Sequence, residues 1–307
     1  MRILIVGAGS TGGYFGARLV QAGRVVSFRV RPARAAALRE TGLQVLSPLG
    51  DFQVTPTLVQ AGQIDRPFDI VLVTVKAYGL AAALEDFAPA VGPETLVLPV
   101  LNGLRHIDDL QARFGPERVV GGVCRVSTQL DAQGRVLHLS PVQELVVGEL
   151  SGAHTARIAA LHAFLGDAGF DTRLSLRIVQ ELWNKWILLA TLGTVCTLAR
   201  ASVGEIAATD GGDAFVRAVL AETVAVATAA GCAPEQKVVD GTLALLTTAG
   251  SPLTSSMYRD LVAGDRVEVD QVLGDLRARA RRAGVAVPLV AAAFIQLDAY
   301  QRRRDAR

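Results

Sequence analysis

The sequence predicts an α/β domain in residues 1–175, followed by an all-helical domain in residues 176–307. Up to about residue 175, short apolar runs typical of buried strands alternate with stretches of helical periodicity, and beyond it the strand signals disappear. A glycine-rich turn directly follows the first predicted strand. Because strands that alternate with helices pair in parallel, we expect a doubly wound parallel sheet in the first domain.

In the first domain, the elements follow one another in the order that such a sheet requires. The strongest predicted strands cover residues 2–7, 24–30, 69–75 and 95–103, and the first helices cover residues 11–23 and 31–42. Residues 43–59 predict a small hairpin, residues 118–150 further strands with turns, and residues 154–168 a helix before a last strand at 170–176.

The second domain shows only helical patterns. They cover residues 176–199, 212–230, 234–248, 253–263, 266–284 and 289–303, and Gly231, Gly250 and Gly284 lie where helix ends are expected.

Composition excludes several classes of protein. A net charge of +2 is too small to indicate binding to nucleic acid or to a membrane surface, and no run of about 18 apolar residues predicts a membrane span. The three cysteines form no CxxC pair and the histidines show no ligand spacing, so we expect neither a disulfide framework nor a metal site. The N-terminal residues show no signal-peptide pattern, and we expect a cytoplasmic protein.

The turn "GAGSTG" matches the pattern GxGxxG between a strand and a helix, the context that makes this pattern specific for a dinucleotide. The first glycine permits the tight turn, the second lets the backbone approach a pyrophosphate, and the third allows close packing of helix and strand. The predicted cofactor-binding residues of this turn are Gly7, Ala8, Gly9, Ser10, Thr11 and Gly12.

The end of the second strand indicates which dinucleotide binds. An NAD site usually has an acidic residue there, whereas this chain has Arg29, Arg31 and Arg34 and no acid. Because a guanidinium can pair with a 2′-phosphate, we expect NADP(H), with Arg31 as the main contact. Arg34 belongs to the same group of arginines, although it could simply be a solvated helix residue.

Lysine is rare: 28 of the 31 basic residues are arginine. Lys76 and Asn102 follow predicted parallel strands, at the sheet edge where ligands bind in such folds, although either could simply satisfy loop backbone. Lys185 lies between two tryptophans in the apolar run "ELWNKWILL". It could extend to solvent, or it could be a partly desolvated proton donor that faces a cleft between the domains.

Such a lysine needs a carboxylate nearby to hold it in place. Glu268 is the first candidate, with Asp260 and Asp270 as weaker ones. Ser255 and Ser256 stand near a predicted helix start, where they could bind a substrate carboxylate or cap the helix.

Together these residues resemble the ketopantoate reductase (2-dehydropantoate 2-reductase) family. The shared motifs run along nearly the whole chain: "GAGSTGGYFGARL", "VKAYGL", "LNG", "GRVLH", "ELWNKW", "SVGEI" and "SSMYRD…EVD". The resemblance implies a Rossmann-type domain, a helical domain like the C-terminal one of 6-phosphogluconate dehydrogenase, and NADPH-dependent reduction of ketopantoate to pantoate on the way to pantothenate and coenzyme A. It is compatible with a homodimer.

The resemblance also implies roles for individual residues. Lys185 matches the general acid, Glu268 the acidic residue of the catalytic and cofactor site, and Ser256 the substrate-binding serine. Asn102 matches an asparagine that touches cofactor and substrate, and Lys76 a lysine on the cofactor side. Arg31 matches the arginine that binds the 2′-phosphate.

The chain departs from the family pattern at three substrate-contacting positions. Where the family commonly has asparagines, this chain has Leu189, Gly193 and Val203, which predicts a more apolar substrate pocket. Ketopantoate is therefore the first substrate hypothesis, and a more apolar 2-oxo acid or other carbonyl compound is the second. A catalytically silent NADPH-binding sensor is the alternative from another class.

Overall fold

The computed structural model describes residues 1–306, and contacts within the chain divide it into two units. The α/β unit contains residues 1–101 and 106–179, and the helical unit contains residues 102–105 together with the chain from residue 180 onward. The expected domain boundary is residue 175, and no pattern in the sequence indicates that residues 102–105 group with the helices.

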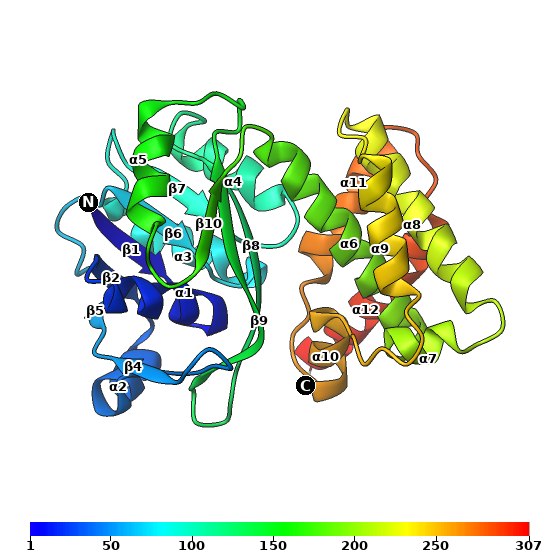
Figure 1. Cartoon of the computed structure of the whole chain (residues 1–307), viewed down its shortest axis with the longest axis horizontal. Coiled ribbons are helices and arrows are strands. Elements are labelled where there is room, and N and C mark those ends of the chain that lie inside the picture. Colours follow the sequence, from blue (N-terminus) through cyan, green and yellow to red (C-terminus); the bar gives the residue numbers. More distant parts are fainter. Residues whose placement is uncertain (307) are drawn as a thin grey trace. The chain divides into compact units, whose positions relative to one another are not determined.

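A parallel five-stranded sheet in the order β5-β2-β1-β6-β7 lies at the centre of the α/β unit (Figure 1). The apolar side chains of the central strands β1 and β6 are at most 1% exposed, as expected for strands of a doubly wound sheet. In the register, Val6 lies opposite Arg29 on one side and Val73 on the other, so the carboxyl ends of three strands are level. The strands are β1 (Arg2–Val6), β2 (Val25–Arg29), β5 (Thr57–Val59), β6 (Ile70–Val73) and β7 (Leu96–Pro99).

A second, mixed sheet has the order β10-β9-β3-β4, with β8 also paired to β9. Its strands are β3 (Leu43–Leu46), β4 (Phe52–Val54), β8 (Gly121–Leu130), β9 (Val136–Gly148) and β10 (Asp171–Leu174). The expected hairpin is formed by β3 and β4, which pair antiparallel. The expectation that it extends to residue 59 is wrong, because β5 leaves the hairpin and pairs in parallel with β2.

Helices complete the α/β unit. They are α1 (Ser10–Gln21), α2 (Pro32–Thr41), α3 (Leu80–Phe87), α4 (Arg105–Phe114) and α5 (Ala156–Leu165), with 3-10 turns at Ala77–Gly79 and Ala88–Ala90. Tyr14 and Phe15 of α1 are fully buried in the same core as Phe28 of β2. A Cβ at Gly16 would overlap the Phe28 ring, so glycine allows α1 to pack closely on the sheet.

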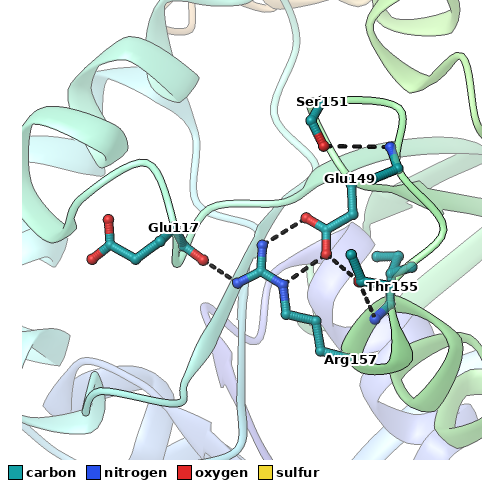
Figure 2. A network of polar contacts seen from close by, with 7 residues as sticks. Glu117, Glu149, Ser151, Thr155 and Arg157 are labelled. Carbon is teal, nitrogen blue, oxygen red and sulfur yellow. Dashed lines mark hydrogen bonds and ion pairs between the residues drawn. The ribbon is translucent and has the colours of Figure 1, made fainter.

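One buried carboxylate ties the end of β9 to the start of α5 (Figure 2). The Glu149 side chain is 4% exposed and accepts two hydrogen bonds from Arg157, at 2.6 and 2.7 Å, and one from the Thr155 hydroxyl at 2.5 Å. Arg157 also donates to the backbone oxygen of Glu117. The hydrogen bonds from Arg157, assisted by that from Thr155, hold the pKa of Glu149 below its ordinary value despite burial.

The helical unit has no strand among its described residues. Its helices are α6 (Ile178–Ala199), α7 (Val203–Ala207), α8 (Gly212–Ala229), α9 (Gln236–Leu246), α10 (Ser256–Ala263), α11 (Asp275–Arg282) and α12 (Pro288–Asp305). The short α7 was not among the expected helices; it begins with a capping box formed by Ser202 and Glu205. The helix expected at residues 266–284 is present from residue 269 to residue 282, but its part Asp270–Gly274 is π-helical and α11 continues it without a break. The fold class, a parallel sheet with helices followed by a helical part, is confirmed.

The long helix α6 is apolar enough and long enough to cross a membrane by composition alone. However, 67% of its most apolar 18-residue window is buried inside the structure, as in the core helix of a soluble protein. Its polar side chains also have partners within the unit: the hydroxyls of Thr191 and Thr223 on α8 lie 3.0 Å apart. We therefore interpret α6 as a core helix.

Candidate active site

The glycine-rich turn lies between β1 and α1, where two of its glycines are required by geometry. Gly7 has a φ of 103°, a conformation that favours glycine. A Cβ at Gly12 would overlap the Gly7 carbonyl oxygen and the Thr74 hydroxyl. At Gly9, by contrast, no atom lies within 4 Å of the position of a Cβ. This open space lets a ligand approach the backbone.

The N-terminus of α1 suits an anion. Gly9 is the N-cap residue and no side chain caps the helix, so the first N–H groups of α1 can serve a pyrophosphate. The first turn of α1 also contains no acidic residue that would repel one. The residues present therefore fit a dinucleotide.

Thr74 is a site residue that the sequence analysis missed. Its hydroxyl lies 3.0 Å from the backbone oxygen of Val6 and 2.9 Å from that of Gly7, and so it fixes the start of the glycine turn to the end of β6. A polar residue at the end of an otherwise apolar strand was the available signal.

The arginines after β2 differ in their surroundings. Arg29 is 8% exposed and pairs with Asp86 of α3, so its charge is neutralised inside the protein. Arg31 is exposed and precedes α2. Its Nη2 atom lies 4.0 Å from the position of a Cβ on Gly79. The structure thus brings Arg31 close to the turn that begins after Lys76, which is itself exposed.

In the helical unit, Lys185 is half-buried on α6 between two buried tryptophans. The rings of Trp183 and Trp186 contact each other at a tilt of 35°, with centroids 4.9 Å apart. The indole N–H of Trp186 donates to the backbone oxygen of Val272 at 2.9 Å. This bond holds the π-helical turn Asp270–Gly274 against α6. The bonded residue, Trp186, directly follows Lys185.

Glu268 is 7% exposed and stands just before that π-helical turn, with its backbone oxygen accepting from the N–H of Val272 at 3.1 Å. A π-helical turn is uncommon and often marks a functional site. The segment that contains Asn102 reaches the same turn. Gly103 has a φ of 76°, and a Cβ there would lie only 2.7 Å from the backbone oxygen of Gln271. The backbones that carry Lys185, Glu268 and Asn102 therefore converge within the helical unit.

The two serines at the start of α10 have different environments. Ser255 is 5% exposed and is the N-cap: its hydroxyl accepts from the N–H of Tyr258 at 3.0 Å. Ser256 is half-buried in the first turn and is not the capping residue. Ser255 thus has a structural role, and Ser256 remains the candidate for binding a substrate.

The three positions that depart from the family pattern are all at least half-buried. Leu189 is half-buried on α6. Gly193 is buried, and a Cβ there would overlap the terminal methyl of Met257, which is 4% exposed. Val203 is fully buried, and its N–H donates to the backbone oxygen of Leu253 at 2.9 Å. Met257 thus fills the space beside Gly193, a contact that the sequence did not indicate.

Within residues 1–306, no three His, Cys, Asp or Glu side chains are grouped in a way that could hold a metal ion. The glycine turn, the uncapped N-terminus of α1 and the exposed Arg31 define a dinucleotide-binding protein as the class.

Comparisons with known proteins define the family. Residues 3–152 match the ketopantoate reductase PanE/ApbA family, and residues 177–301 match its C-terminal region. The chain therefore belongs to the ketopantoate reductase family and is an NADP-dependent oxidoreductase.

Individual relatives agree with this assignment. An uncharacterized oxidoreductase of Bacillus subtilis, YkpB, is 33% identical over 98% of this chain and 99% of its own length. A 2-dehydropantoate 2-reductase of Halobacterium salinarum is 28% identical over 94% of this chain and 95% of its own. The crystal structure of 2-dehydropantoate 2-reductase from Geobacter metallireducens superposes with a TM-score of 0.88 at 31% identity, covering 97% of this chain and 99% of that one.

Proposed function

We propose that the chain uses NADPH to reduce the 2-oxo group of ketopantoate to the hydroxyl group of pantoate. Membership of the family supports NADPH-dependent reduction of a 2-oxo acid. The observation that carries the proposal is the convergence, within one unit, of three backbone segments. They are α6 at Trp186, the π-helical turn at Val272, and the Asn102 segment at Gly103.

In this proposal, each side chain has one task. NADPH, when bound, supplies the hydride for the carbonyl carbon. Lys185 donates a proton to the carbonyl oxygen as negative charge develops there, and Glu268 holds the ammonium group in position. Ser256 binds the substrate carboxylate, and Asn102 orients the substrate carbonyl against the cofactor.

We also propose that residues of the α/β unit bind NADPH. The backbone of Gly7–Gly12 and the N-terminus of α1 bind the pyrophosphate, and Arg31 binds the 2′-phosphate. Lys76, exposed at the end of the strand that Thr74 ties to the glycine turn, lies on the cofactor side.

A second substrate class is favoured by the apolar surroundings of α6. Leu189 and the Met257 methyl group over Gly193 offer no hydrogen bond to a substrate hydroxyl. A 2-oxo acid with an apolar side chain would match such a site better. A site that hydrogen-bonds a substrate hydroxyl group rejects the analogue without that group, whereas an apolar site accepts the analogue.

The experiment compares two substrates that differ by one hydroxyl group. Ketopantoate and 3,3-dimethyl-2-oxobutanoate are offered to the enzyme with NADPH, and the loss of NADPH absorbance is followed. The ketopantoate hypothesis requires a hydrogen bond to the substrate hydroxyl group, and it therefore predicts that kcat/KM favours ketopantoate by at least about a hundredfold. Equal or higher values for the deoxy analogue would select the apolar class, and no turnover of either compound or of a wider panel of 2-oxo acids would contradict the function.

The proposed reaction also implies a compartment and a biosynthetic pathway. Reduction of ketopantoate would place the enzyme in the cytoplasmic synthesis of pantothenate and coenzyme A. A homodimer is part of the proposal on the strength of the family resemblance, and sedimentation equilibrium tests it.

A further inference from the structure

The side chain of Arg34 is held against the glycine turn instead of extending into solvent. Arg34 lies in the first turn of α2 and is half-buried, and its Nε donates to the backbone oxygen of Ala8 at 3.1 Å. Its Nη1 atom lies 2.6 Å from the position of a Cβ on Gly134, in the turn between β8 and β9. The interpretation of Arg34 as a solvated helix residue is therefore wrong.

This guanidinium lacks a neutralising partner. Among the described residues, no carboxylate lies within ion-pair distance of Arg34, and its Nη2 atom is buried without a hydrogen-bond partner. Asp131, in the turn that contains Gly134, is already engaged, because it pairs with Arg135 at 2.6 Å. Asp86 is likewise occupied by Arg29. Burial lowers the pKa of Arg34 from its ordinary value, as expected where a charge is desolvated and uncompensated.

Burying a cation without an anion is unfavourable, and an unpaired donor adds to the cost. The protein therefore gains if a ligand supplies the missing anion. The glycine turn that Arg34 touches is where a dinucleotide approaches, because the space at Gly9 is open. The pyrophosphate already has the N-terminus of α1, whereas the ribose hydroxyl groups lie at the end of the second strand in folds of this kind.

We propose that Arg34 is a second cofactor-specificity residue, which binds the 2′-phosphate of NADP(H) together with Arg31. A phosphate ester at this position would accept a hydrogen bond from Nη1 of Arg34 and neutralise the guanidinium, while the bond from Nε keeps the side chain fixed on Ala8. The inference depends on the NADP(H) cofactor and not on the identity of the oxo acid.

The test uses ligands that contain no nicotinamide, so it is independent of activity. Binding of adenosine 2′,5′-bisphosphate and of 5′-AMP is measured by calorimetry for the wild type and for Arg34→Gln, in which the amide can still donate to Ala8. We expect the variant to bind the bisphosphate at least about tenfold more weakly and 5′-AMP within about twofold of the wild type. The matched control, Arg39→Gln on the exposed side of the same helix, should change neither.

Two results would overturn the proposal. An equal loss for both ligands would mean that Arg34 only positions the glycine turn, and unchanged binding of both would mean that it does not contact the cofactor. If Arg34→Gln does not fold, Arg34→Lys carries the test, since lysine keeps the charge but loses the planar fork. It should lose affinity severalfold for the bisphosphate alone, and any equal effect on both ligands contradicts the proposal.

Discussion

Three arginines within six residues at the end of β2 have three different environments. Arg29 is neutralised by Asp86, Arg31 is exposed, and Arg34 is half-buried with an unsatisfied donor. An exposed guanidinium can pair with an added phosphate at little cost, whereas an arginine already in an ion pair must first break it. Arg31 rather than Arg29 is therefore expected to recognise the extra phosphate of the cofactor.

This difference predicts a selective effect at the scale of one residue. Arg31→Ala should weaken NADPH binding by about tenfold and leave NADH binding within about twofold, because only NADPH has the 2′-phosphate. Fluorescence titration of the two reduced cofactors measures both constants. Arg39→Ala is the control on the same helix, and an unchanged ratio of the two constants in Arg31→Ala would remove Arg31 from the cofactor site.

At the scale of elements, the turn between β1 and α1 contains glycines of two kinds. At Gly12 a side chain would overlap the Gly7 carbonyl and Thr74, which belong to the protein itself. At Gly9 the backbone has a φ of −81° and ψ of −157°, which alanine can adopt, and the space beyond it is open. Gly12 thus serves packing, and Gly9 serves the ligand.

A matched pair of variants separates these roles. We expect Gly12→Ala to lower the free energy of unfolding by about 1–3 kcal/mol, because the turn and β6 must move apart. Gly9→Ala should leave unfolding within about 0.5 kcal/mol of the wild type and weaken NADPH binding instead. Urea denaturation and NADPH titration measure the two quantities, and a larger loss of stability in Gly9→Ala than in Gly12→Ala would contradict this assignment.

The Glu149–Arg157 network links elements through a charge and so predicts a dependence on pH. Because the pKa of Glu149 is lower in the folded than in the unfolded state, the ionised pair stabilises the fold above the unfolded-state value. That contribution is lost as the pH falls through the folded-state value. At neutral pH we expect Glu149→Gln to lower the free energy of unfolding by about 2 kcal/mol.

The difference between wild type and Glu149→Gln should shrink in acid, as the pH falls below the ordinary carboxyl pKa and through the lowered folded-state pKa, where the wild-type carboxyl group also becomes protonated. Urea denaturation at several pH values measures it. Glu85→Gln is the control, since its exposed contact with Arg113 at 3.6 Å should contribute little at any pH. A difference for Glu149→Gln that stays constant in acid would contradict the electrostatic explanation.

At the scale of the whole molecule, hydrophobic periodicity and the positions of glycines predicted the features that depend on neighbouring residues in the sequence. The buried runs of β1, β2, β6 and β7 and the long helices of the second unit carry strong patterns, and the glycine turn is specific in its context. What could not be predicted depends on distant partners. The pairing of β5 with β2 rather than with the hairpin is one case, and the pairing of Arg29 with Asp86, 57 residues away, is another.

In the helical unit, too, contacts between residues far apart in the sequence could not be predicted. The π-helical turn before α11 was not predicted from its own residues, and its contact is distant in sequence: the backbone oxygen of Val272 accepts from Trp186, 86 residues earlier. Met257 over Gly193 likewise requires α10 to lie on α6. Sequence reasoning therefore named candidates for the site, but the neighbours that shape them became visible only in the folded unit.

The most direct test of the account measures turnover and cofactor binding in one lysine variant. Lys185→Ala should lower kcat by at least about a hundredfold, because the proton donor is lost, and leave the Kd for NADPH within about twofold. The control is Lys237→Ala, whose side chain is 79% exposed and pairs with Glu235, and it should change neither quantity. If Lys185→Ala kept wild-type turnover, or lost affinity for NADPH in proportion to kcat, the role of Lys185 as the acid would be contradicted.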